Sequence, residues 1–260
     1  MKLLIGIPTG GSPCDPFLQS LASLRLPACI TSVERRTVAG NFVPAQRELI
    51  FRYALEREAD LIAMLDDDMV LPSTAIADLC DALMADPQAA LAGALYYSRD
   101  GIRPMAVADW DASRTTAAHV PGFDGTSPVE VAGVGFGCTL LRASALRGLT
   151  QPFLRTHVFI EERAARVRVC DEDYLFCETL RRAGSRILLH SGVRCGHFDR
   201  ATGRTFPERW EDASATRVPR MAVRYPDGTT ALVPLAPGVA EAAERHVAAS
   251  IEYVYAGDEI

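Results

Sequence analysis

Apolar positions follow two different periods along the first 200 residues of the chain. Short, nearly continuous apolar runs favour buried strands, whereas apolar residues at every third or fourth position favour helices. The two kinds of segment alternate, which predicts an α/β fold with a mostly parallel, Rossmann-like sheet and helices on both faces. Strands are predicted at residues 2–7, 28–33, 61–65 and 90–97, and helices at 16–24, 43–57 and 76–84.

Both periods disappear over residues 98–127, which are rich in Gly, Pro, Asp and Arg. Such a stretch predicts a long loop or lid rather than a core element. Glycines recur in residues 129–142, where they allow either close approach of the backbone to a ligand or a bulge.

Periodic structure returns with a helix predicted at residues 171–183. Acidic residues occupy its first turn, and Gly184 follows as a stop signal. The apolar residues 187–190 then predict a strand that leads to Gly196 and His197.

The character of the sequence changes again beyond residue 202. Residues 225–230 carry a hairpin-turn signal between two apolar runs, and residues 239–253 are rich in alanine and predict a helix. We therefore predict one domain over residues 1–200 and a C-terminal extension of a hairpin and a helix over residues 201–260. The extension is interpreted as a unit for forming a homo-oligomer or for binding an acceptor, and its sequence does not choose between them.

Composition restricts the classes of function. The 260 residues carry a net charge of −6, which argues against a general electrostatic hold on nucleic acid. No apolar stretch approaches the ~20 residues of a membrane span, and the apolar run at residues 3–7 is too short for a signal peptide, so a cytoplasmic location is predicted. Seven cysteines without paired spacing predict reduced thiols.

Three consecutive carboxylates, Asp66, Asp67 and Asp68, follow the strand predicted at residues 61–65. If the strand continued, Asp66 and Asp68 would project from one face and Asp67 from the other. Two adjacent carboxylates repel unless a cation lies between them, and Mg²⁺ or Mn²⁺ with substrate phosphates suits such a pair. Alternatively, the acids only stabilise the start of the helix that begins near Pro72.

Several motifs in fixed order resemble those of a GT-A fold glycosyltransferase of the family-2-like type. The resemblance covers roughly residues 1–200 and leaves the last quarter of the chain unexplained. Its motifs are Ile7-Pro8-Thr9, Ala45-Gln46-Arg47-Glu48, Leu65-Asp66-Asp67-Asp68, Gly137-Cys138-Thr139-Leu140-Leu141, Glu172-Asp173-Tyr174 and Gly196-His197.

The resemblance implies that a nucleoside-diphosphate sugar, UDP- or GDP-linked, lies across the strand ends. The acidic block is similar to the DxD motif, which binds Mn²⁺ or Mg²⁺ on the diphosphate. By this likeness Asp68 is a direct metal ligand, Asp66 contacts the ribose or the metal, and His197 completes the metal shell. Asp67 is interpreted as mainly structural and is counted with the donor-binding positions. The remaining donor-binding candidates are Pro8, Thr9, Glu34, Arg36, Arg47 and Gly135.

Asp173 resembles the catalytic base of inverting relatives, and Glu172 beside it is assigned an acceptor contact. An inverting transfer needs such a base for the proton of the acceptor hydroxyl, whereas a retaining one does not. Acids in the first turn of a helix are also common without any catalytic role.

The resulting prediction is a metal-dependent, hexosyltransferase-like glycosyltransferase that moves a sugar to an acceptor hydroxyl, with inversion as the favoured course. The acceptor is a saccharide, lipid, small metabolite, protein or modified nucleic acid. Two alternatives stay open: a nucleotidyltransferase of similar fold, and a noncatalytic nucleotide- or sugar-binding module. The first usually has a basic loop after its first strand, and residues 8–13 contain no cation.

Overall fold

The computed structural model describes residues 1–99, 101, 103–110, 118–119, 127–161, 166–208, 210, 220–224, 230–234 and 251–254. The chain divides into two compact units, Met1–Arg209 and Trp210–Ile260. The first unit contains the sheet, the helices and every candidate site residue named above.

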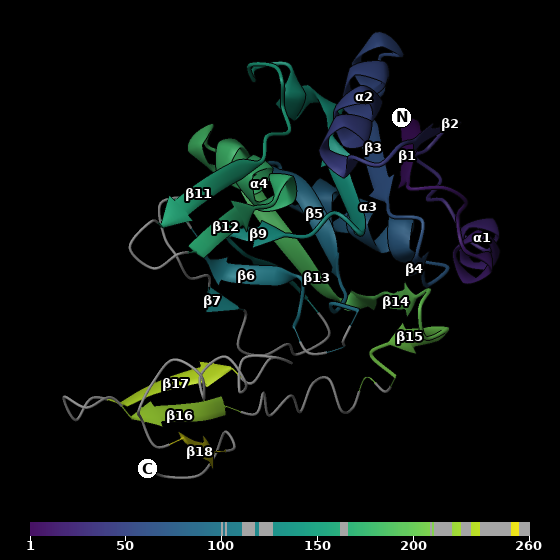
Figure 1. Ribbon diagram of the computed structural model, residues 1–260. Helices are drawn as coiled ribbons and strands as arrows, with labels where there is room; N and C mark the ends of the chain where they lie inside the picture. Colours follow the sequence, from purple (N-terminus) through teal and green to yellow (C-terminus); the bar gives the residue numbers. More distant parts are fainter. Residues whose placement is uncertain are drawn as a thin grey trace. The chain divides into compact units, whose positions relative to one another are not determined.

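A seven-stranded sheet forms the centre of the first unit, in the order β2-β1-β3-β10-β5-β13-β8 (Figure 1). Five strands run in one direction, and β10 and β8 run in the other. The predicted α/β fold with a mostly parallel sheet is confirmed. The strands are β1 (Lys2–Thr9), β2 (Ser32–Ala39), β3 (Leu61–Leu65), β5 (Ala89–Leu95), β8 (Pro128–Glu130), β10 (Cys138–Arg142) and β13 (Arg186–Arg194).

Helices cover both faces of this sheet, as the alternating pattern predicted. On one face, α1 and α3 pack on a core that includes Leu3, Ile5 and Leu61. On the other face lies α2, so close to β1 that a Cβ atom on Gly6 would come within 2.2 Å of Ile50. Rings from α2 and α4 meet there, with 5.2 Å between the centroids of Phe51 and Phe176. The helices are α1 (Asp15–Ala22), α2 (Val43–Glu56), α3 (Ala75–Ala85), α4 (Glu172–Arg182) and the 3-10 turn η1 (Ala143–Leu146).

Strand β2 corrects one sequence prediction. The apolar segment 28–33 predicted a strand that ends before Glu34, but the strand begins at Ser32 and continues through the charged residues to Ala39. It lies at the edge of the sheet and pairs only with β1 among the described strands. Edge strands commonly carry exposed charged side chains, so hydrophobicity did not mark this one.

Three small sheets accompany the central one within the first unit. They are β15-β14-β4, built from Arg204–Phe206, Gly196–Asp199 and Met69–Val70; β7-β6-β9, built from Ala118–His119, Ala106–Asp109 and Gly133–Val134; and β11-β12, built from His157–Glu161 and Arg166–Cys170.

Strands β6 and β7 lie inside the region predicted as a loop or lid. Ala106 and Val107 of β6 are buried, and Val107 packs in a small cluster with Trp110 and Ala132. Part of this region therefore belongs to the core. Strands this short offer too few residues to show an alternating pattern.

The second unit contains a three-stranded sheet in the order β17-β16-β18, formed by Thr230–Pro234, Arg220–Arg224 and Ile251–Val254. Strands β16 and β17 pair antiparallel, with Arg224 opposite Thr230. Residues 225–229, where the turn was predicted, lie outside the described residues. Of the helix predicted at 239–253, residues 239–250 also lie outside them, and Ile251–Tyr253 belong to β18.

No helix in the described parts of the chain is long and apolar enough to cross a membrane. The seven cysteines are free thiols, as their spacing predicted.

Candidate functional site

The three carboxylates occupy a turn that three distant segments hold in place. Strand β3 ends at Leu65, and Asp66–Asp68 connect it to β4. The Asp66 amide donates to the Gly137 carbonyl at 2.9 Å, and the carbonyls of Asp67 and Asp68 accept from Cys14 and Phe198 at 3.0 and 2.8 Å. The backbone of the turn is therefore fixed before any ligand binds.

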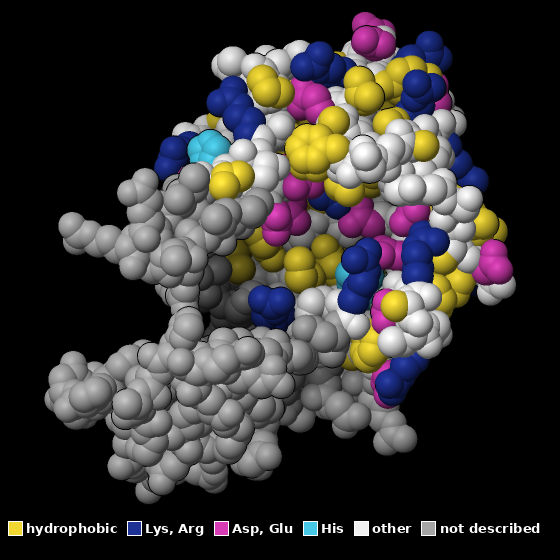
Figure 2. Space-filling model, viewed as in Figure 1, with side chains coloured by type: hydrophobic (Ala, Val, Ile, Leu, Met, Phe, Trp, Pro, Cys, Tyr) yellow, Lys and Arg dark blue, Asp and Glu magenta, His cyan; other side chains and the backbone are white. Residues whose placement is uncertain are grey.

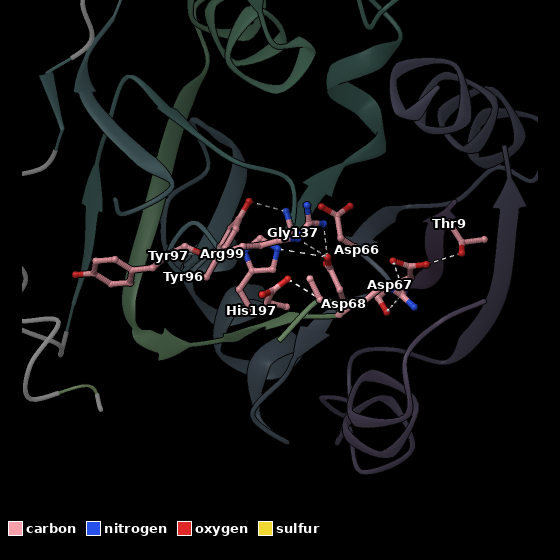
Figure 3. Close-up of polar contacts among 12 residues, drawn as sticks. Thr9, Asp66, Asp67, Asp68, Tyr96, Tyr97, Arg99, Gly137 and His197 are labelled. Atoms are coloured by element: carbon pink, nitrogen blue, oxygen red, sulfur yellow. Dashed lines mark hydrogen bonds and ion pairs between the residues drawn. The ribbon is translucent and has the colours of Figure 1, made fainter. Parts of the chain in front are cut away.

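The turn changes the geometry that strand alternation predicted. Because the strand stops before the acids, Asp66 and Asp68 do not share a strand face, and each of the three carboxylates contacts a different set of partners (Figure 3). All three still line one cleft.

Asp66 is joined to Arg47 near the start of α2. The Arg47 Nη2 atom lies 2.7 and 2.8 Å from the two Asp66 carboxylate oxygens, and Nη1 lies 2.6 Å from Oε1 of Glu172. Arg47 is only 5% exposed. One buried guanidinium thus connects the acidic turn with the start of α4, two segments far apart in the sequence.

Asp173 follows Glu172 in the first turn of α4 and is 7% exposed. Burial raises the pKa of Asp173 to about 7, against the lowering effect of Arg47 and together with the repulsion from Glu172. Burial likewise raises the pKa of Asp66, although Arg47 opposes the shift. Asp173 is therefore partly protonated near neutral pH, chiefly because it is buried.

Asp67 ties the end of β1 to the turn between β14 and β15. The Thr9 hydroxyl donates to its carboxylate, and Arg200 Nη2 lies 3.0 Å from its other oxygen. Arg200 also donates to the Ser12 carbonyl at 2.9 Å. The Asp67 side chain thus has structural partners and also lines the cleft.

Asp68 lies between Arg99 and His197. Its Oδ2 atom accepts from Nε of Arg99 at 3.1 Å and also from Nη2, and it lies 3.4 Å from Nε2 of His197. Burial alone would raise the pKa of Asp68, but the hydrogen bonds from His197 and Arg99 outweigh it and lower the pKa to about 2. This carboxylate is therefore ionised at every physiological pH.

The orientation of His197 is set by its other ring nitrogen. Nδ1 lies 2.8 Å from the carbonyl oxygen of Tyr97, which can only accept, so Nδ1 carries a proton. Nε2 is thereby left facing Oδ2 of Asp68 at 3.4 Å. Histidines that bind metals are usually held in this way by a carbonyl or carboxylate at the second nitrogen.

The three carboxylates of the turn border a cleft of about 500 Å³, within the usual size range of small-molecule sites. Figure 2 shows acidic side chains grouped near the middle of this face with basic side chains beside them. The cleft is lined by Pro8, Thr9, Gly10, Gly11, Ser12, Val43, Gln46, Arg47, Asp66, Asp67, Asp68, Arg99 and Arg200.

Of the predicted donor-binding residues, three lie away from this cleft. Glu34 contacts Tyr53 of α2 and Arg57, which directly follows that helix. The guanidinium of Arg36 lies 4.8 Å from the centre of the Tyr53 ring. Both belong to the middle of β2, which extends further than predicted. Gly135 is buried against Tyr96: a Cβ atom there would come within 2.2 Å of the tyrosine hydroxyl, so this glycine makes room for a side chain of the protein.

The cleft residues that were not predicted as site residues include Arg99, Arg200 and Gln46. Arg99 and Arg200 add positive charge to the cleft, where residues 8–13 contain none. Gln46 is buried, and its side-chain amide donates to the Thr9 carbonyl at 3.0 Å. Arg99 lies in residues 98–127, for which the sequence predicted a loop or lid but no site residue. Arg200 lies three residues after His197, but nothing in its local pattern points to the cleft.

Asp68 and His197 fit one divalent ion. Ligands about 2.1 Å from an octahedral ion lie about 3 Å apart when adjacent, and the observed separation of Oδ2 and Nε2 is 3.4 Å. Within the described residues no group of three or more His, Cys, Asp or Glu side chains converges as a metal site. An ion here would therefore need further ligands, which substrate phosphates commonly supply.

The sequence matches no protein-family model and no curated protein. Solved structures do match the fold. A197 from STIV superposes with a TM-score of 0.55 at 19% identity, covering 91% of this chain and 96% of that one. A structure of GalNAc-T7 with UDP, GalNAc and Mn²⁺ superposes with a TM-score of 0.52 at 14% identity, covering 75% of this chain and 43% of that one. At these identities the likeness shows the fold alone, and that fold is of the GT-A type, as predicted.

Proposed function

We propose that this chain is a metal-dependent glycosyltransferase that moves a sugar from a nucleoside-diphosphate sugar to an acceptor hydroxyl with inversion. The observation that carries the proposal is the placement of Asp68 and His197, 3.4 Å apart, beside a cleft of about 500 Å³ with acids and arginines along it. The similar GalNAc-T7 structure contains UDP and Mn²⁺, which supports the same class of ligand here.

Asp68 and His197 would hold the metal, with the diphosphate of the donor completing its shell. When bound, such an ion stabilises the negative charge that develops on the departing diphosphate. Pro8, Thr9 and Gln46 line the same cleft, and we assign them to the nucleoside. Arg47 keeps the Asp66 carboxylate directed by two hydrogen bonds, and Asp66 is assigned to the ribose or to the metal.

Asp173 is the proposed base. A carboxylate that accepts a proton from a hydroxyl works best when its pKa lies near the operating pH, and the pKa of Asp173 is raised to about 7. Glu172, one residue before it, is held by Arg47 and is assigned an acceptor contact. Neither carboxylate is part of the cleft lining, so the acceptor would approach the donor from the α4 side of Arg47.

The test is calorimetric titration of the wild-type chain and of Asp68→Ala with UDP, GDP and sugars linked to them, with and without Mn²⁺. The substitution removes one of the two protein ligands. Changes even outside a metal's first shell cost about 10- to 100-fold in affinity, so we expect the Mn²⁺-dependent gain in affinity to fall by at least about 100-fold.

The matched control is Asp78→Ala, which removes a half-buried acid of α3 that does not line the cleft. It should bind as the wild type does. Unchanged metal-dependent affinity in Asp68→Ala would remove the central assignment.

The two alternatives differ in what they release. A nucleotidyltransferase would consume a nucleoside triphosphate and release pyrophosphate, and a binding module would bind without turnover. The lack of cations in residues 8–13 counted against a nucleotidyltransferase. Arg99 and Arg200 supply cations to the same cleft, so this lack no longer distinguishes a nucleotidyltransferase from a glycosyltransferase. Release of a nucleoside diphosphate from a sugar donor supports glycosyl transfer.

A further inference from the structure

We propose that Arg99 binds the diphosphate of the donor, and that in the free protein its guanidinium is held on Asp68 until a divalent metal displaces it. The proposal rests on the proposed function, because it concerns the same metal and the same class of ligand.

The first observation is that Arg99 occupies the atom a metal would need. Its Nε and Nη2 atoms both donate to Oδ2 of Asp68, and this is the oxygen that lies 3.4 Å from Nε2 of His197 (Figure 3). An ion bound between Asp68 and His197 would take the same oxygen. Arg99 and the metal therefore compete for one position.

The second observation is that only one member of this group is free to move. The side chains of Asp68 and His197 are 3% and 13% exposed, whereas that of Arg99 is 62% exposed. The backbone around Arg99 is tied in a turn, with Ser98 donating to the Arg103 carbonyl at 2.8 Å. Displacement by a metal would thus require a rotation of the Arg99 side chain alone.

The third observation concerns charge. A buried carboxylate that loses its cationic partner is strongly destabilising, and the Asp68 side chain is buried with Arg99 paired to it. Arg99 neutralises it in the free protein, and the metal would neutralise it in the bound one. The exchange leaves the site with two additional positive charges and places a free guanidinium beside the cleft.

The last step is the destination of that guanidinium. Arg99 lines the cleft together with Arg200, and Arg200 is already committed to Asp67 and to the Ser12 carbonyl. The planar fork of arginine matches the oxygens of a diphosphate through paired, charge-assisted hydrogen bonds. A diphosphate that arrives with the metal would therefore meet Arg99 at the moment it is released from Asp68.

The experiment compares the wild-type chain with Arg99→Gln in two titrations. Mn²⁺ alone should bind Arg99→Gln about 10-fold or more tightly than the wild type, the change that about 1.4 kcal/mol produces, because the competitor is gone. At saturating Mn²⁺, UDP or GDP, whichever the wild type prefers, should bind Arg99→Gln about 10-fold more weakly, because the phosphate contact is lost. The corresponding nucleoside should bind both proteins equally.

Arg204→Gln is the control, since Arg204 is exposed and pairs with Glu208 outside the cleft. It should match the wild type in both titrations, and thermal melting of both variants confirms folding. If Arg99→Gln shows unchanged affinity for Mn²⁺ alone, or unchanged affinity for the diphosphate at saturating Mn²⁺, the proposal is overturned. If the wild type itself shows no Mn²⁺-dependent binding of either diphosphate, the proposed function fails as well, so the two failures are distinguishable.

Discussion

At the scale of single residues, the site is governed by an imbalance of buried charge. Arg47 faces the carboxyl groups of Asp66, Glu172 and Asp173, and these acids raise its own pKa although burial by itself would lower it. One cation cannot neutralise three carboxylates in a dry environment, so the acid with the weakest hold on Arg47 takes up a proton. Asp173 is that acid, because the ion pairs of Arg47 go to Asp66 and Glu172.

The first prediction concerns the pH dependence of transfer. If Asp173 is the base, the rate should rise as pH increases through about 7, where its carboxyl loses the proton. Asp173→Asn should bind the donor with nearly unchanged affinity and lose transfer by about 100-fold or more, within the range that positioned bases contribute. A fully active Asp173→Asn would exclude this role.

The second prediction concerns stability and needs no substrate. Between pH 3.8 and about 7 the folded protein holds on Asp173 a proton that the unfolded chain has lost. Stability therefore falls as pH rises through this window. Urea unfolding should show that the free energy of unfolding of Asp173→Asn, relative to that of the wild type, is higher at pH 8 than at pH 5. Asp15→Asn, which changes an exposed acid in the first turn of α1, should show no such gain.

At the scale of elements, the acidic turn Asp66–Asp68 is a junction, by which we mean a turn that contacts several strands and helices at once. Its backbone donates a hydrogen bond to Gly137 before β10 and accepts from Cys14 before α1 and from Phe198 in β14. Its side chains reach α2 and the turn after β5. Helix α2 contributes most to this junction, because Arg47 and Gln46 both point from its first turns into the buried side of the cleft.

The third prediction tests this junction. Arg47→Met removes a buried cation that pairs with Asp66 and Glu172, and breaking a buried pair commonly costs about 3–5 kcal/mol of the free energy of unfolding. Urea unfolding should show a lower midpoint with an unchanged slope.

The matched control lies on the same helix. Arg52→Met breaks the pair with Glu48, but the Arg52 side chain is largely exposed, so the loss should stay within about 1 kcal/mol. Equal losses in the two variants would contradict the view that Arg47 joins these elements.

At the scale of the whole molecule, all residues that line the cleft belong to the first compact unit, Met1–Arg209. The sheet of the second unit has its own strand pairing through β16, so it can serve a separate purpose.

The fourth prediction follows from this division. A chain ending at Arg209 should bind the nucleoside diphosphate and Mn²⁺ with the affinity of the full chain, measured by calorimetry. If the second unit forms a homo-oligomer, light scattering should show a larger assembly for the full chain than for the shortened one. Loss of nucleotide binding on shortening would show that the second unit contributes to the site.

The sequence by itself determined the order of most strands and helices, the end of α4 just before Gly184 and the place of the acids directly after β3. These features follow from hydrophobic period and local backbone preference, which neighbouring residues encode. It did not mark β2 through its charged residues, or the short β6, because an exposed edge and a four-residue strand leave no clear period.

Only the tertiary structure decided the arrangement of the site. It joined Arg47 to Glu172 across 125 positions and Arg99 to Asp68 across 31, and it directed three adjacent carboxylates to three different partners. Such contacts depend on how strands and turns from distant parts of the chain meet at one edge of the sheet. The local pattern of apolar and polar residues indicates whether a residue is buried. It does not indicate which distant residue that residue contacts.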